Sequence, residues 1–153
     1  MNQQLRQDAD RIIADAIHAV LPDQAVIRAL EAASFPGRIR LIAAGKAAWQ
    51  MAQAASKTLG DSLECGVICT KYGHCGGKLP KITCCEGGHP IPDENSLRAT
   101  DAALSLVQGL TAQDTVLFLL SGGGSALFEK PLIPLRELQD ITQQLLASGA
   151  SIV

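Results

Sequence analysis

The sequence predicts an α/β fold in which a mainly parallel sheet is flanked by helices, and three observations support this. Short apolar runs alternate along the chain with longer segments whose apolar residues recur every three or four positions. One apolar run, Thr115–Leu120, leads directly into the glycine-rich segment SGGGS, as buried parallel strands often lead into ligand-binding loops. Apolar residues make up 47% of the 153 residues and charged residues 18%, which favours one well-buried core.

The individual helices and strands are predicted from changes in the spacing of apolar residues along the chain. Apolar residues recur with helical spacing from Leu5 to Val20, Pro22 ends that pattern, and Asp23 is a suitable N-cap for a second helix. Strand-like and helical patterns then alternate, which is typical of a Rossmann-like three-layer domain, in this case a partial one. Strands are expected at 38–44, 65–70, 82–85 and 115–120, and further helices at 47–59, 95–108 and 135–146.

The loop after the last predicted strand is the strongest candidate for a binding site. Gly122, Gly123 and Gly124 have no side chains, so their backbone N–H groups can close on an anion between the hydroxyls of Ser121 and Ser125. Ligands of open α/β sheets bind at the carboxyl ends of strands, where this loop is expected. The structural alternative is a tight turn in which the glycines only permit unusual dihedral angles.

Lys46 is the candidate catalytic cation. It follows the first predicted strand and opens a helix, where its charge faces the positive end of the helix dipole at a cost of a few tenths to about one kcal/mol. A phosphate between Lys46 and the helix end would offset this cost, whereas the structural alternative is a lysine that bends into solvent. The segment is not a Walker A loop, because it lacks the spaced glycines and the Ser or Thr after the lysine.

Polar residues after the second and third predicted strands are candidates for the wall of the same site. Lys71 and His74 follow the strand at 65–70, and His89 and Asp93 follow the strand at 82–85. Loops at strand ends that hold polar residues commonly surround binding sites. For the two histidines, a structural hydrogen-bonded role is equally compatible with the sequence, and their spacing does not indicate a metal pair.

Composition restricts the classes of function. A formal charge of −2 provides no basic field for nucleic acid or an anionic membrane, and no apolar run approaches the roughly 20 residues that a membrane span needs. The amino terminus lacks an apolar signal core, so we expect a cytoplasmic protein. The odd number of cysteines and their spacing predict neither a disulfide framework nor a zinc site, and Cys65, Cys69 and Cys84 are expected to be small buried residues.

Four blocks of sequence, in order and spacing, resemble the amino-terminal domain of the bacterial glycerate 2-kinase family, whose members are often labelled hydroxypyruvate reductases. The resemblance covers the whole chain but only about the first third of the family's length. We therefore expect residues 1–153 to be the amino-terminal portion of the family's first domain, with the rest of that domain and a second domain absent. The blocks are GKAAWQMA at 45–52, TKYGH at 70–74, GGHPIPDE at 87–94 and LSGGGSALFEKP at 120–131.

The resemblance implies that ATP, assisted by Mg²⁺, phosphorylates D-glycerate at its 2-hydroxyl in a cleft between two domains. The family's active-site lysine falls on Lys46 and its glycine-rich anion loop on Ser121–Ser125. The implied partners are glycerate and ATP, a homo-oligomer is compatible with the sequence, and a fragment of the family is expected to be incomplete and inactive on its own.

Three other functions stay open from the sequence. A hydroxypyruvate reductase would need a G-x-G-x-x-G fingerprint after a strand, and the contiguous glycines 122–124 do not supply it. A domain similar to sugar-phosphate isomerases or lactonases would bind a phosphorylated sugar without ATP and depend less on Lys46. A non-catalytic remnant would expose apolar surface and self-associate.

Overall fold

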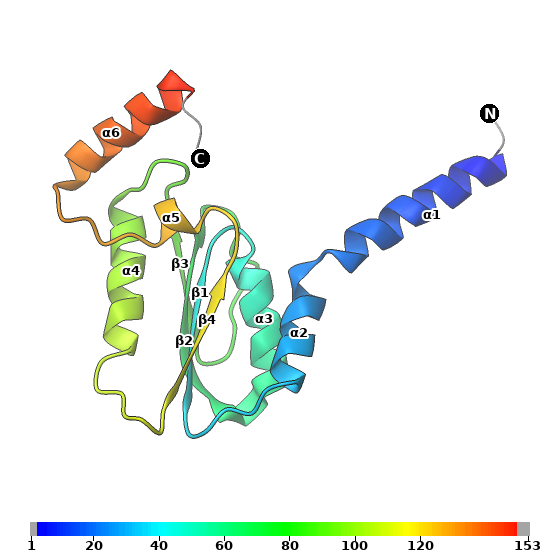
Figure 1. Ribbon diagram of the computed structural model, residues 1–153, viewed down its shortest axis with the longest axis horizontal. Helices are drawn as coiled ribbons and strands as arrows, with labels where there is room; N and C mark the ends of the chain where they lie inside the picture. Colours follow the sequence, from blue (N-terminus) through cyan, green and yellow to red (C-terminus); the bar gives the residue numbers. More distant parts are fainter. Residues whose placement is uncertain (1–2, 150–153) are drawn as a thin grey trace.

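The computed structural model describes residues 3–149, and its centre is a four-stranded parallel sheet (Figure 1). The strands lie in the order β3-β2-β1-β4, and every neighbouring pair is parallel. The α/β class and the parallel sheet predicted from the sequence are therefore confirmed. The strands are β1 (Ile39–Ala44), β2 (Leu63–Lys71), β3 (Ile82–Gly87) and β4 (Thr115–Leu120).

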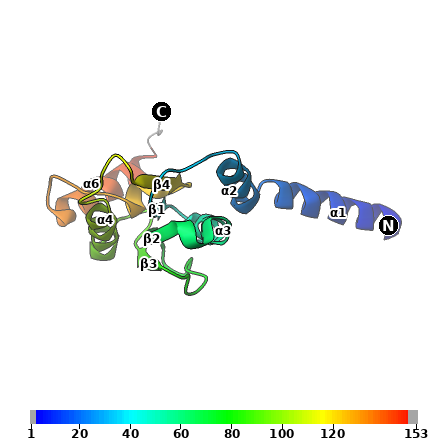
Figure 2. The ribbon, with the colours of Figure 1, turned by 90° about the horizontal axis from the view of Figure 1, so that it is seen from below.

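Helices cover both faces of the sheet, which makes three layers (Figure 2). On one face α3 packs over β1 and β2 and α2 packs against α3, and Leu41 and Ile68 are fully buried in the core there. On the other face α4 packs over β2 and β3, with its small residues Ala99 and Ala103 against Val67. The helices are α1 (Gln3–Ala19), α2 (Pro22–Glu31), α3 (Ala48–Leu59), α4 (Glu94–Leu106), α5 (Gly124–Leu127) and α6 (Leu135–Ser148), with a 3₁₀ turn η1 at Gly60–Ser62.

The prediction that the run at 115–120 is a buried strand is wrong. β4 is an edge strand, and its residues alternate between half-buried and exposed. Leu117 and Leu119 pack toward α2 and α3, whereas Val116, Phe118 and Leu120 are exposed on the other face. The sequence pattern could not reveal this, because a continuous apolar run is equally compatible with a central strand and with an edge strand.

The first and last helices have no buried residues among those described. The structure shows α1 extending away from the sheet and α6 lying above the end of α4 (Figure 1). Their amphipathic patterns are real, but the apolar side chains Ile12, Ile17 and Leu145 are more than half exposed. No helix within residues 3–149 is long and apolar enough to cross a membrane.

Three local expectations need correction. α2 begins with Pro22, so Asp23 lies in its first turn and Leu21 is the N-cap, without a side-chain cap. α3 begins at Ala48, so Lys46 precedes the helix rather than opening it. Of the cysteines expected to be buried, Cys69 is buried while Cys65 and Cys84 are half-buried; all the described cysteines are free thiols.

Candidate anion-binding site at the carboxyl edge of the sheet

The candidate residues come from four loops that meet at one edge of the sheet. Because all four strands are parallel, their carboxyl ends lie together near α5, at the upper end of the sheet in Figure 1. Lys46 follows β1, Lys71 ends β2 and His74 lies just beyond it, His89 follows β3, and Ser121–Ser125 follow β4. The topology thus brings residues that are distant in sequence to the same edge.

The loops after β1 and β4 are locked to each other by hydrogen bonds. The Lys46 N–H donates to the Gly122 carbonyl at 3.0 Å, and the Ala47 N–H donates to Ser121 Oγ at 3.0 Å. The Ser121 hydroxyl donates in turn to the Ala44 carbonyl at 3.3 Å. Gly45 has a φ of +114°, and a Cβ there would lie 2.3 Å from Ser121 Oγ and 2.5 Å from the Ser121 carbonyl oxygen. The two loops therefore approach so closely that only glycine fits at position 45.

Lys46, His89 and Gly123 meet at one point. A Cβ built on Gly123 would lie 2.7 Å from His89 Nε2 and 3.2 Å from Lys46 Cε. Gly123 has a φ of +85°, in the left-handed region, so glycine is favoured there by its backbone as well as by its neighbours. The sequence predicted each of these residues as a candidate, and the structure places the side chains of Lys46 and His89 beside Gly123.

The loop after β2 supports the loop that carries Lys46. The His74 ring donates its Nδ1–H to the Lys46 carbonyl at 2.9 Å, and the Thr70 hydroxyl donates to the Gly45 carbonyl at 2.9 Å. Thr70 is buried and was not among the sequence-predicted residues. A polar residue at the end of an otherwise apolar strand is the signal that could have indicated it.

The electrostatic environment of the site is positive. Burial and the charges of Lys46 and Lys71 lower the pKa of His89 below its usual value. His74 acts in the same direction, so His89 is neutral near pH 7. Within residues 3–149 Lys46 forms no ion pair with a carboxylate. Its charge is therefore available to a ligand.

The glycine loop offers backbone donors on the same side. Within the described chain, the N–H groups of Gly122 and Gly123 donate to no protein acceptor, and the space that a Cβ of Gly122 would occupy is open. Ser125 lies at the start of α5, is exposed, and makes no side-chain hydrogen bond to another described residue. Free N–H groups beside an unpaired lysine and a neutral imidazole form an arrangement suited to an anion with several oxygen atoms.

Asp93 has a structural role that accounts for its position. It is the N-cap of α4, and its Oδ1 accepts the Ser96 N–H at 2.9 Å in a capping box. The Tyr72 hydroxyl donates to its other oxygen at 2.7 Å. Burial would raise the pKa of Asp93, but the hydrogen bonds from Tyr72, Ser96 and Gly88 outweigh it and lower that pKa. The carboxylate is thus committed to the start of α4.

Comparison with known proteins identifies the family and the fold of the chain. Residues 8–153 match the family model described as a domain of unknown function, DUF4147. The chain belongs to the DUF4147 family. The crystal structure of glycerate kinase from Thermotoga maritima superposes with a TM-score of 0.90 at 48% sequence identity, covering 99% of this chain and 37% of that one. The fold is therefore that of the matching part of a solved glycerate kinase structure.

Curated relatives carry kinase or hydroxypyruvate reductase names and are much longer than this chain. The chain is 49% identical to D-glycerate 2-kinase of Thermotoga maritima and 40% identical to glycerate 2-kinase of Pyrococcus horikoshii, covering 98% and 97% of this chain. A relative from Agrobacterium vitis, 38% identical over 96% of this chain and 34% of its own length, carries a hydroxypyruvate reductase name. The chain spans 36% of the length of each of the two kinases.

Proposed function

We propose that this DUF4147 chain binds a phosphoryl group at the carboxyl edge of its sheet, as part of an ATP-dependent kinase that phosphorylates D-glycerate at the 2-hydroxyl. The observation that carries the proposal is the meeting of Lys46, His89 and Gly123, with free N–H groups beside them. The names of the relatives support the substrate, because both kinases are similar to this chain over nearly its whole length.

Each group has a defined part in such a transfer. The transferred phosphoryl group carries negative charge on its oxygen atoms, so catalysis depends on positioning and on fixed positive charge. Lys46 would stabilise that charge or the carboxylate of glycerate, and the N–H groups of Gly122 and Gly123 would hold phosphate oxygens. His74 and Ser121 both hold the peptide bond between Lys46 and Ala47, and the Gly122 carbonyl accepts the Lys46 N–H, so the backbone that carries the cation is fixed before the ligand arrives.

The expected Mg²⁺ finds no dedicated set of ligands among the described residues. Within residues 3–149 no three His, Cys, Asp or Glu side chains come together as a metal site, and Asp93 is engaged as the cap of α4. These residues do not fit a site in which the protein itself encloses the metal. The parts that Lys46, His74 and the glycine loop play in binding a phosphoryl group do not depend on such a site.

A reductase is the weaker candidate. The three glycines of the β4 loop are contiguous, and Gly123 lies beside Lys46 and His89. They lack the spacing of a dinucleotide fingerprint, in which separated glycines let a helix approach a pyrophosphate. A sugar-phosphate isomerase or lactonase would use the glycine loop with less dependence on Lys46. Measuring how strongly phosphate binding depends on Lys46 therefore distinguishes an isomerase or lactonase from the kinase.

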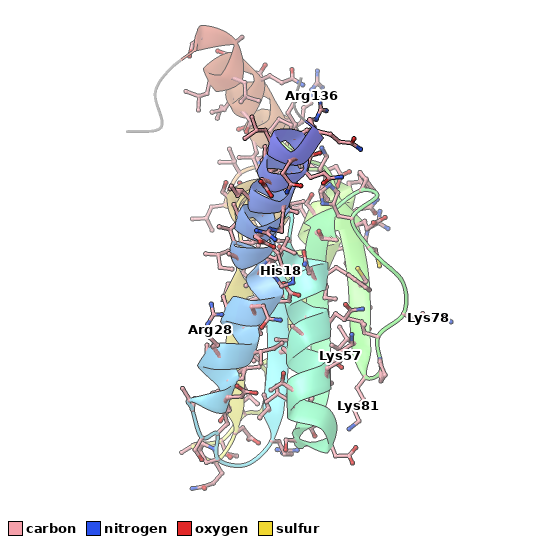
Figure 3. The ribbon with its side chains drawn as sticks, turned by 90° about the vertical axis from the view of Figure 1, so that its right-hand side faces the viewer. His18, Arg28, Lys57, Lys78, Lys81 and Arg136 are labelled. Carbon is pink, nitrogen blue, oxygen red and sulfur yellow. The ribbon has the colours of Figure 1, made fainter. Side chains whose placement is uncertain are left out.

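The first experiment is a titration of this chain with inorganic phosphate, followed through the backbone amide NMR signals of Gly122–Gly124. Lys46→Met should weaken binding about tenfold or more, because a charge-assisted hydrogen bond contributes about 1.5–3 kcal/mol. Lys57→Met is the matched control, since Lys57 lies in the last turn of α3, away from the loop (Figure 3), and should leave the affinity unchanged. Equal affinity of the two variants would contradict the proposal.

We also propose that residues 1–153 form the amino-terminal portion of the first domain of a longer kinase. The supporting fact is that the chain spans 36% of its relatives' length. ADP release would be measured with ATP, Mg²⁺ and D-glycerate. Phosphate binding without turnover is the expected result, whereas turnover that disappears in Lys46→Met would place the whole kinase site within these residues and contradict the domain proposal. The cytoplasmic location stays a prediction.

A further inference from the structure

The loop between β2 and β3 is held against α3 by the single tryptophan of the chain. This loop, residues 72–81, runs along the outer edge of the sheet, and Lys78 extends from it (Figure 3). The Trp49 indole donates its Nε1–H to the Gly77 carbonyl at 2.9 Å, and a Cβ on Gly76 would lie 2.7 Å from the indole ring. The indole therefore packs directly on the backbone that follows Cys75.

Cys75 lies over one face of β3. Its N–H donates to Glu86 Oε1 at 2.8 Å. Glu86 and Cys84 are two residues apart in β3, so their side chains point to the same face of the sheet. Cys84 packs in the apolar cluster on the α3 side, the same cluster that includes Trp49. Cys75 lies close enough to raise the pKa of the Cys84 thiol, and Cys85 packs in the cluster on the opposite face.

We propose that Cys75 and Cys84 form a dithiol site that a low-molecular-weight disulfide oxidises to an intramolecular disulfide. The proposal does not depend on the kinase function. The Cys75 thiolate attacks one sulfur of the small disulfide, which releases one small thiolate and leaves a mixed disulfide on Cys75. The Cys84 thiolate then attacks the Cys75 sulfur and displaces the second small thiolate. Two protein thiols are oxidised and one small disulfide is reduced to two thiols.

The two thiols differ in their surroundings. Cys75 is half-buried, and its thiol donates to the carbonyl of the exposed Gly77. Burial, followed by the neighbouring Cys75, Glu86 and Cys85, raises the pKa of Cys84. Because the thiolate is the attacking form, the step carried out by Cys84 accelerates as the pH rises.

The disulfide would form one residue from a support of the candidate anion site. Cys75 follows His74, whose ring donates a hydrogen bond to the Lys46 carbonyl. It also precedes Gly76, which packs on Trp49. Oxidation therefore changes the environment of an indole that can be followed by fluorescence, and it constrains the loop that supports Lys46.

The test is oxidation of this chain with oxidised glutathione, with free thiols counted and peptides mapped after tryptic cleavage. We expect two of the five thiols to disappear. The peptide 72–78 should become linked to the peptide 82–98, with a change in Trp49 fluorescence that dithiothreitol reverses. Cys84→Ser should stop at a glutathione adduct on Cys75. The matched control Cys85→Ser changes the neighbouring thiol on the opposite face of β3, and it should form the link as the wild type does.

Repeating the oxidation in urea makes the result specific to the fold. In the unfolded chain the neighbouring Cys84 and Cys85 should pair with Cys75 about equally, whereas the folded chain should select Cys84. The proposal is overturned if the folded wild type stops at a mixed disulfide. It is also overturned if Cys75 pairs with Cys85, or if the two serine variants behave alike.

Discussion

Replacing Gly45 by alanine tests whether the loops after β1 and β4 approach as closely as the structure indicates. The added Cβ would lie 2.3 Å from Ser121 Oγ, 2.5 Å from the Ser121 carbonyl oxygen and 2.8 Å from its carbonyl carbon. Two of these atoms belong to the backbone, so rotation of a side chain cannot relieve the clash. The φ of +114° adds its own cost, because alanine rarely adopts positive φ.

The expected loss of stability is large for a single methyl group. The unfavourable backbone conformation costs about 1–3 kcal/mol. Moving Ser121 away would also weaken its hydrogen bonds with Ala47 and Ala44, each worth about 1 kcal/mol. We therefore expect Gly45→Ala to lower the free energy of unfolding by at least about 3 kcal/mol. A chain that fails to fold altogether agrees with the same reasoning.

Urea denaturation followed by circular dichroism measures this effect, and Gly60→Ala is the matched control. Gly60 also has a positive φ, of +53°, but a Cβ there would meet nothing within 4 Å. Its ψ of −122° lies outside the left-handed helical region, so its replacement should carry only the backbone cost of about 1–3 kcal/mol, without a clash. If Gly45→Ala and Gly60→Ala have the same stability, the close contact between Gly45 and Ser121 does not exist, and the locked pair of loops is refuted.

Two further predictions concern the site itself. Gly123→Ala should cost about 1–2 kcal/mol for its left-handed conformation. It should reduce the free energy of phosphate binding by more than it reduces the free energy of unfolding, because its methyl group would displace His89 and the end of Lys46. Equal losses in the two free energies, measured by parallel NMR and urea titrations, would contradict this. The pKa of His89 is lowered in the folded chain, so the unfolded chain binds more protons and stability should decrease as the pH falls below about 6.5. His89→Gln should reduce that decrease in urea titrations between pH 7 and pH 5, and an unchanged pH dependence would argue against a neutral His89.

The sequence predicted the loops of the site better than their mutual contacts. Lys46 and Ser121–Ser125 could be placed because each follows an apolar strand and lies in or beside glycine-containing sequence, and both are local signals. The contact of His89 with Gly123 could not be predicted, because it depends on the order of strands in the sheet. β3 and β4 lie at opposite edges of the sheet, yet His89 and Gly123 from the loops that follow them meet beside Lys46, and this is a property of the tertiary structure.

Burial was the least predictable feature. A helical period shows which side chains share a face, and it does not show whether another element covers that face. The pattern at Leu5–Val20 is correct for α1, yet Ile12 and Val20 are largely exposed. Likewise, the run at 115–120 is apolar throughout, but only alternate residues of β4 pack on the described helices. In both cases the burial of the side chains depends on whether another element packs against them.

The exposed face of β4 also matters for handling the protein in solution. The segment Thr115–Leu120 is uncharged, lacks proline and glycine, and lies at an open edge with Val116 and Phe118 facing solvent. Such hexapeptides are the usual starting points of β-aggregation. A gatekeeper charge at Val116, five positions before Ser121, would oppose edge-to-edge stacking while leaving the glycine loop untouched. Colloidal solubility and ligand binding can thus be engineered at opposite ends of one short strand.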